Sequence, residues 1–196
     1  MRELAISMTG EESGRVESPD LVLLLRRAKD GDTAAFEQVL LMHDRRVFRT
    51  ALRLLGSVAD AEDASQEVFL KLQKHLRRFD DTRAFGPWLY RVTVNTCRDL
   101  AARRRPGLPL DSIDAAFPAS QPREMDIEEQ RETVRMALQR LPEKERAAVV
   151  LRDIEGLSTA EVARALGTTE ATVRSQISSA RLKIKRFAES FRGRVK

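Results

Sequence analysis

The chain has 196 residues and a mass of 22.2 kDa, which is room for one large domain or two small ones. Its formal net charge is +5 and its pI is near 9.8. A single cysteine, Cys97, excludes an internal disulfide framework and any multi-cysteine zinc or iron–sulfur site. Apolar runs such as Leu21–Leu25 are too short to span a bilayer, and residues 1–20 lack the apolar stretch of a secretory signal. We therefore predict a basic, cytoplasmic protein without membrane insertion.

Residues 1–19 are polar and aperiodic, and we expect them to form a flexible leader. Apolar residues then recur at helical spacing through residues 20–105, which predicts a first helical domain. Asp20, Asp32 and Asp60 are candidate N-caps, whereas Gly31 and Gly56 are candidate stops. These signals predict four helices, over Leu21–Lys29, Thr33–Leu55, Ala61–Arg78 and Pro87–Arg104.

Residues 106–126 hold four of the seven prolines and show no apolar period, so they are predicted to be a flexible linker. A second helical domain is expected over residues 127–191, followed by a basic tail at residues 192–196. Its predicted helices are Ile127–Arg140, Glu143–Glu155, Ser158–Leu166 and Glu170–Phe191. The fold class is therefore predicted to be all-α, with two small helical domains joined by a flexible linker.

The second domain carries the pattern of a helix-turn-helix. Ser158 and Glu161 have the spacing of a capping box, Gly167 suits a tight turn, and Thr169 can cap the next helix. That last helix has an apolar stripe on one side and a stripe of small and basic residues on the opposite, outward side. The outward stripe suits insertion into a DNA major groove. Residues 171–196 contain eight basic residues and one acidic residue, so phosphate affinity is expected. The alternative is a helical hairpin with a solvated basic face.

Two features of the first domain have both a functional and a plain structural interpretation. One helix face carries Asp60, Asp63 and Glu67. These acids could form a docking surface for a basic partner, they could be metal ligands, or they could simply be favoured by the positive end of the helix dipole. No histidine stands nearby, so we predict no metal site and no cofactor. A second stripe combines a ring, two guanidiniums and an amide that suit unpaired bases and phosphates: Trp88, Arg91, Asn95 and Arg98. Trp88 alone would also fit a half-buried core position.

Catalytic signals are missing from the sequence. His43 and His75 are far apart and neither lies in a recognisable motif, and no phosphate-binding, dinucleotide-binding or nucleophile-elbow pattern occurs. We expect both histidines to be surface or half-buried structural residues and Cys97 to be a small buried residue. The protein is therefore predicted not to be an enzyme and to have no catalytic residue and no small-molecule substrate.

Three segments resemble bacterial extracytoplasmic-function (ECF) sigma factors, group IV of the sigma-70 superfamily. Residues 60–70, Asp-Ala-Glu-Asp-Ala-Ser-Gln-Glu-Val-Phe-Leu, resemble the family's core-polymerase-binding helix. Residues 85–95, Phe-Gly-Pro-Trp-Leu-Tyr-Arg-Val-Thr-Val-Asn, resemble the helix that melts and reads the minus-ten element. Residues 141–146, Leu-Pro-Glu-Lys-Glu-Arg, together with the helix-turn-helix, resemble the family's fourth region, which reads the minus-thirty-five element.

The resemblance implies a transcription initiation factor whose partners are core RNA polymerase, promoter DNA and an anti-sigma factor. Residues 20–105 would then be sigma region 2, and residues 127–191 sigma region 4. The implied polymerase-binding residues are Asp60, Asp63, Gln66, Glu67 and Phe69. The implied minus-ten DNA residues are Arg83, Phe85, Trp88, Arg91, Asn95 and Arg98. The implied minus-thirty-five DNA residues are Thr169, Thr172, Arg174, Ser175, Ser178 and Arg181.

Two other interpretations stay open at this point. A conventional helix-turn-helix transcription regulator would use residues 20–105 as a sensor or dimerisation domain, and it would need a palindromic site but no polymerase. A helical interaction adaptor would have no DNA role and no salt-dependent DNA affinity.

Overall fold

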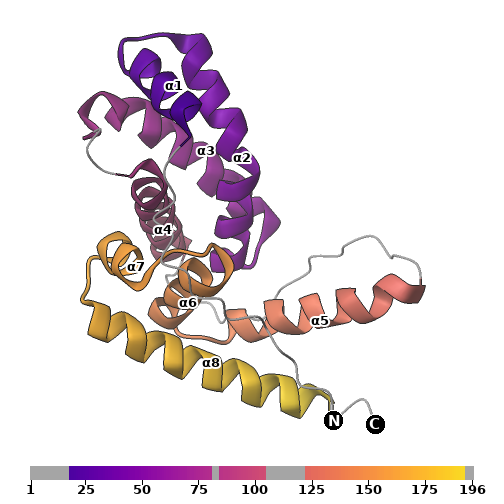
Figure 1. Ribbon diagram of the computed structural model, residues 1–196. Coiled ribbons are helices and arrows are strands. Elements are labelled where there is room, and N and C mark those ends of the chain that lie inside the picture. The colour runs from indigo at the N-terminus through magenta and orange to yellow at the C-terminus, as the bar shows by residue number, and fades with distance from the viewer. Residues whose placement is uncertain (1–17, 81–83, 105–121, 193–196) are drawn as a thin grey trace.

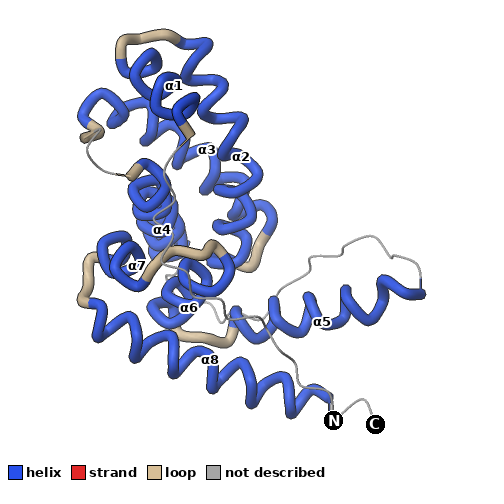
Figure 2. Tube along the Cα trace, in the orientation of Figure 1, coloured by secondary structure: helices blue, strands red, loops and turns tan. Residues whose placement is uncertain are grey.

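The computed structural model describes residues 18–80, 84–104 and 122–192, and the side chains of all of these except 122–129, 191 and 192. Throughout these ranges the regular structure is helical and no strand occurs, which confirms the predicted all-α class (Figures 1 and 2). Among the described helices none is long and apolar enough to cross a membrane. The predicted leader, nearly all of the predicted basic tail and most of the predicted linker lie outside the described residues.

The first body consists of α1 to α4, with a short 3₁₀ turn, Leu76–Arg78, directly after α3. Its core is built from apolar residues of all four helices, and its largest fully buried side chains include Val39, Val68, Leu72 and Phe85. The helix bounds are α1 Pro19–Lys29, α2 Thr33–Leu55, α3 Val58–His75 and α4 Phe85–Arg104. Both bounds of α2 are therefore as predicted.

Helix α2 shows why local signals work when they are strong. The Asp32 carboxylate accepts a hydrogen bond from the Ala35 backbone amide at 3.0 Å, which satisfies one of the orphan N–H groups at the helix start. At the other end Gly56 has φ of +79°, a left-handed conformation that side chains disfavour.

Three predicted helix starts in the first body are wrong, and α4 begins at Phe85 rather than at the predicted Pro87. The N-cap of α1 is Ser18, not Asp20, because the Ser18 hydroxyl accepts from the Leu21 amide at 3.3 Å. Helix α3 begins at Val58 because the Ser57 hydroxyl accepts from the Asp60 amide at 3.3 Å. Serine and aspartate are almost equally good N-caps, so the starts of α1 and α3 each have two candidate capping residues a few positions apart. In both helices the earlier residue, a serine, is the N-cap.

The second body consists of α5 to α8 and departs from prediction in two places. Helix α5 starts at Pro122, five residues before the predicted Ile127, with proline in the first turn where its missing N–H is not needed. The predicted helix over residues 143–155 is α-helical only to Val149 and then opens into a π-helical turn, Val150–Ile154. The bounds are α5 Pro122–Gln139, α6 Glu143–Val149, α7 Thr159–Leu166 and α8 Glu170–Arg192.

The predicted helix-turn-helix is present in α7 and α8. Ser158 and Glu161 make both hydrogen bonds of the capping box, at 3.2 and 2.7 Å. Gly167 ends α7 with φ of +64°. Val162 of α7 packs with Val173 and Ile177 of α8 in one buried cluster, so the apolar stripe of α8 faces inward as predicted.

The two bodies pack directly against each other, which the tethered arrangement of the sequence prediction did not include. Helix α7 lies on α4, and α5 and α6 contact α2 (Figure 1). Tyr90 and Val94 of α4 belong to the same buried cluster as Leu151, Leu157 and Val162 of the second body. An apolar core therefore runs across the junction.

Candidate nucleic-acid and polymerase interfaces

The outward face of α8 carries the residues predicted to contact the minus-thirty-five element. Within the described part of the chain all six are exposed on or next to the N-terminal half of this helix: Thr169, Thr172, Arg174, Ser175, Ser178 and Arg181. The Thr169 hydroxyl caps the helix by accepting from the Thr172 amide at 3.2 Å. The small and basic side chains therefore lie on the outward side of α8, as the sequence pattern predicts.

The two arginines of this face are held by acidic neighbours. Arg174 lies 3.2 Å from Glu170 one turn earlier on α8. Arg181 makes two hydrogen bonds to Asp153 of the π-helical turn, at 2.6 and 2.8 Å, and this pairing raises the pKa of Arg181. The two parallel hydrogen bonds to Asp153 therefore fix the orientation of the Arg181 guanidinium.

The predicted minus-ten residues are divided between surface and core. Arg91, Asn95 and Arg98 are exposed along α4, whereas Trp88 is half-buried. Phe85 has 0% exposure and therefore offers no surface to DNA in this structure. Arg83 lies outside the described residues.

Trp88 belongs to an aromatic cluster that packs against the core of the first body. Its ring centroid lies 4.9 Å from that of Phe79 and 5.7 Å from that of Phe85. His43 meets Phe85 edge-on at 5.3 Å. Packing therefore fixes the orientation of the indole while leaving part of it accessible, and the half-buried position anticipated for Trp88 and the structural role expected for His43 agree with this arrangement.

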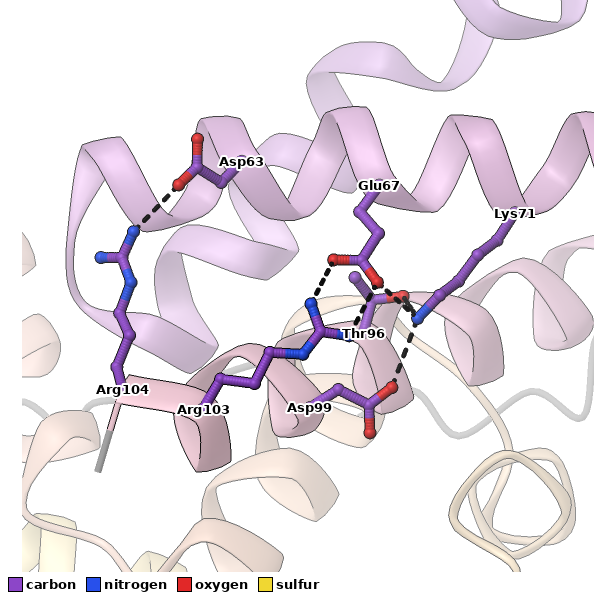
Figure 3. A network of polar contacts seen from close by, with 7 residues as sticks. All are labelled: Asp63, Glu67, Lys71, Thr96, Asp99, Arg103 and Arg104. Atoms are coloured by element: carbon purple, nitrogen blue, oxygen red, sulfur yellow. Dashed lines mark hydrogen bonds and ion pairs between the residues drawn. The ribbon is translucent and has the colours of Figure 1, made fainter. Parts of the chain in front are cut away.

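The acidic face of α3 is neutralised by residues of the same body (Figure 3). Arg104 at the end of α4 pairs with Asp60 and, at 2.9 Å, with Asp63. Glu67 receives Lys71 at 3.0 Å and Arg103 at 3.4 Å, and the Lys71 hydrogen bond is the main cause of its lowered pKa. These pairs are partly solvated, so each contributes only about 0–1 kcal/mol and can be exchanged for a partner's cations.

The remaining residues predicted for polymerase binding take different positions on α3. Gln66 is exposed, whereas Phe69 is half-buried and packs against the core of the first body. Over the described ranges no group of three histidine, cysteine or acidic side chains is placed to hold a metal ion.

A buried polar cluster at the junction of the two bodies was missed by sequence reasoning. Glu155, at the end of the π-helical turn, accepts hydrogen bonds from the Tyr90 hydroxyl at 2.6 Å and the Thr50 hydroxyl at 2.8 Å. Arg53 and Arg46 lie 3.2 and 3.4 Å from the same carboxylate. Burial, and then the hydrogen bond to Glu155, raise the pKa of Tyr90 well above its ordinary value. No local pattern could reveal this cluster, because its members lie far apart in the chain.

Arg146 forms a second buried contact between the bodies. Its guanidinium donates to the Leu54 carbonyl oxygen of α2 at 2.5 Å, to Gln139 Oε1 at 2.7 Å and to the Leu141 carbonyl oxygen at 3.1 Å. Gln139 in turn donates to the Arg53 carbonyl oxygen at 2.9 Å. The contacts to Leu54 and Arg53 use carbonyl groups at the C-terminus of α2, which have no partner within their own helix.

A pocket of about 360 Å³ adjoins this junction and is lined from both bodies. Its lining includes Cys97 together with Arg98 and Glu143, which pair at 2.7 Å. As predicted, Cys97 is buried, and burial raises the pKa of its thiol to about 12.

Cys97 should make the folded protein sensitive to alkali. Below the ordinary thiol pKa both states hold the proton, and the contribution to stability is fully present. Between that value and about 12 the unfolded chain loses its proton first, so stability falls with rising pH. We expect the slope to approach about 1.4 kcal/mol per pH unit, and urea unfolding between about pH 7 and pH 10 measures it. Cys97→Ala should flatten the slope; equal slopes would contradict the assignment.

The chain is similar to known proteins along most of its length. Residues 40–106 match sigma-70 region 2, and residues 131–184 match sigma-70 region 4. The chain is 36% identical over 177 residues to the ECF RNA polymerase sigma factor SigM of Mycobacterium tuberculosis, covering 89% of this chain and 87% of that protein. It is 34% identical over 171 residues to the ECF RNA polymerase sigma-E factor of Escherichia coli K12, covering 81% of this chain and 89% of that protein.

Solved structures show the same similarity in three dimensions. CnrH, solved in complex with the cytosolic domain of CnrY, is 27% identical with a TM-score of 0.67, covering 87% of this chain and 98% of that chain. RpoE of Bartonella quintana, solved in complex with the anti-sigma factor NepR, shares the fold at 22% identity and the same TM-score, covering 79% of this chain and 96% of that chain. The resemblance expected from the motifs is thereby confirmed, and the chain belongs to the ECF sigma factors of the sigma-70 family.

Proposed function

We propose that this chain binds core RNA polymerase and directs transcription initiation at promoters with a minus-ten and a minus-thirty-five element. The second body would read the upstream element through α8, and the first body would open and read the downstream element through α4. The role is non-enzymatic and is exercised in the cytoplasm, where the polymerase and the chromosome are.

The observation that carries this proposal is the presence of two different DNA-compatible faces on one family-matched chain. Helix α8 exposes short side chains between two arginines, which suits close approach to base edges in a major groove. Helix α4 exposes Arg91 and Asn95 beside the part-exposed ring of Trp88, which suits an unpaired strand. A conventional repressor or activator needs the first of these faces and has no use for the second.

The acidic face of α3 is the proposed polymerase dock. The proposal is supported by the ion pairs that Asp60, Asp63 and Glu67 already make with arginine and lysine side chains of the same body. A basic polymerase surface would replace Arg103 and Arg104 with little net change in solvation, because those arginines are more than half exposed.

An anti-sigma factor is the proposed regulatory partner. CnrH, which this chain resembles along most of its length, was solved with the cytosolic domain of CnrY. A protein that covers α4 and α8 together would block both DNA-compatible faces at once.

Run-off transcription with purified core polymerase tests the proposal. Specific initiation that depends on added protein is the expected result. A conventional regulator would instead bind a palindromic site without polymerase, and an adaptor would show no salt-dependent DNA affinity. Either of those outcomes would reject the sigma-factor assignment.

Asn95→Ala should impair promoter opening more than closed-complex binding. The exposed amide is proposed to hydrogen-bond an unpaired base, an interaction made only after strand separation, and its loss should reduce the melted fraction about three- to tenfold. Permanganate reactivity of unpaired thymines measures the effect. Gln38→Ala removes an exposed amide from α2 of the same body and serves as the matched control. Unchanged permanganate reactivity in Asn95→Ala would rule out this role.

Arg174→Ala should weaken binding to the minus-thirty-five element. Loss of one guanidinium contact is expected to reduce affinity about five- to a hundredfold and, if phosphate is its target, to lower the salt slope by about one. Glu170→Gln makes an informative contrast, because it releases Arg174 from its 3.2 Å ion pair and should leave affinity equal or higher. Electrophoretic mobility shifts over a salt series distinguish the two. Equal losses in both variants would point to a fault in helix α8 itself.

A further inference from the structure

Two arginines at the C-terminal end of α4 lie on the acidic face of α3 (Figure 3). Arg104 pairs with Asp60 and, at 2.9 Å, with Asp63. The two terminal nitrogens of Arg103 each lie 3.4 Å from one carboxylate oxygen of Glu67. The side chains of Arg103 and Arg104 are 62% and 51% exposed, so water reaches every one of these pairs. Exposed cations of the same chain therefore occupy the proposed polymerase dock.

Lys71 contacts the same acidic face but is held more firmly than the two arginines. Its ammonium lies 3.0 Å from Glu67, 3.1 Å from the Thr96 hydroxyl and 3.3 Å from Asp99. Its side chain is 30% exposed, against 62% for Arg103. Because Lys71 has oxygen partners on both α3 and α4, it would stay in place if the arginines left. Glu67 would then still have one cation beside it.

The same arginines follow directly on the exposed residues of α4 that are proposed to contact the minus-ten element. Arg91, Asn95 and Arg98 are exposed along this helix, and Arg103 lies five residues after Arg98. Five residues correspond to about 7.5 Å of helix rise, which is roughly two base-pair steps along a B-form duplex. A guanidinium that leaves α3 therefore has DNA backbone within reach. Phosphate offers it the same paired oxygens that a carboxylate does.

Resting on the proposed function, we infer that Arg103 and Arg104 move from the acidic face of α3 to the phosphates of promoter DNA when polymerase binds. Basic side chains of the polymerase replace them on Asp60, Asp63 and Glu67. Each carboxylate keeps a cationic partner throughout this exchange, so little ion-pair energy is lost. The exchange also couples the two binding events, because polymerase frees the arginines that DNA then uses.

A double variant, Arg103→Gln with Arg104→Gln, tests the exchange through two affinities that should change in opposite directions. Affinity of the full chain for core polymerase should rise about two- to tenfold, because the acidic face is no longer covered. Affinity of the assembled holoenzyme for a promoter duplex should fall about three- to thirtyfold, because the phosphate contacts are lost. The slope of promoter affinity against salt concentration should decrease by up to about two. Fluorescence anisotropy measures both affinities.

Arg77→Gln with Arg78→Gln is the matched control. It removes the same charge from the same body, at exposed arginines of the 3₁₀ turn that have no ion pair among the described residues. Both affinities of this control should stay within about twofold of the wild type at physiological salt, where distant charges are screened. The comparison therefore separates the exchange from a general effect of net charge.

Three outcomes overturn the exchange: polymerase affinity that does not rise, promoter affinity and salt slope that do not fall, or two double variants that behave alike. Circular dichroism verifies that each variant is folded, and Arg104→Gln alone retains the test if the double variant is not. Run-off transcription by the wild type, measured in parallel, reports on the proposed function alone. Specific initiation without any difference between the variants would therefore reject the exchange and leave the sigma-factor assignment in place.

Discussion

Phe85→Ala is expected to destabilise the first body by about 3–5 kcal/mol. Phe85 has 0% exposure and its ring contacts those of Phe79 and His43 edge-on and that of Trp88 at a tilt. Truncation removes a large apolar surface and leaves a cavity that rigid helices cannot close. Because small domains are stable by only about 5–15 kcal/mol, a large part of the stability of this body is at risk.

Trp88 provides the measurement, because it is the single tryptophan of the chain and packs 5.7 Å from the Phe85 ring. Its fluorescence during urea denaturation reports unfolding of the first body directly. Phe85→Leu keeps most of the volume and should lose far less stability. A loss below about 1 kcal/mol in Phe85→Ala would contradict the packing described here, and any promoter-opening defect could then be assigned to DNA contact.

Arg146→Ala is expected to lower stability by about 3–5 kcal/mol, through the second body and the junction together. Arg146 is only 9% exposed, and its guanidinium satisfies carbonyl oxygens of Leu54, Gln139 and Leu141. Alanine would leave these acceptors buried without that partner, and unmade hydrogen bonds in the interior are costly.

Thermal and urea unfolding measure the effect of Arg146→Ala, with Lys144→Ala as control because Lys144 is exposed on the same helix. The control should change stability by less than about 0.5 kcal/mol. Comparable values for the two variants would show that the buried guanidinium is dispensable. Arg146→Ala also removes the contact to Leu54, which joins the two bodies. The folded variant should therefore be more extended than the wild type.

The helices and the helix-turn-helix were open to prediction because their signals are local. Asp32 and Gly56 act on backbone groups within a few residues, and so do Ser158 and Gly167. The spacing of Val173 and Ile177 likewise shows which side of α8 is buried without reference to its partner helix. Predictions were wrong where local signals competed, as with Ser57 against Asp60, or where no local rule exists, as in the π-helical turn after Val149.

What the sequence by itself determined was the helical class, the two DNA-compatible stripes and the family to which the chain belongs. Only the tertiary structure decided that Phe85 lies in the core and that Arg103 and Arg104 pair with the acidic face of α3. It also decided that Glu155 is buried against residues of the other body. Glu155 and its partners Thr50 and Tyr90 are separated by 105 and 65 residues. Their contact depends on how the apolar surfaces of the two bodies pack together. No single segment of the sequence determines that packing, because it joins residues that are far apart in the chain.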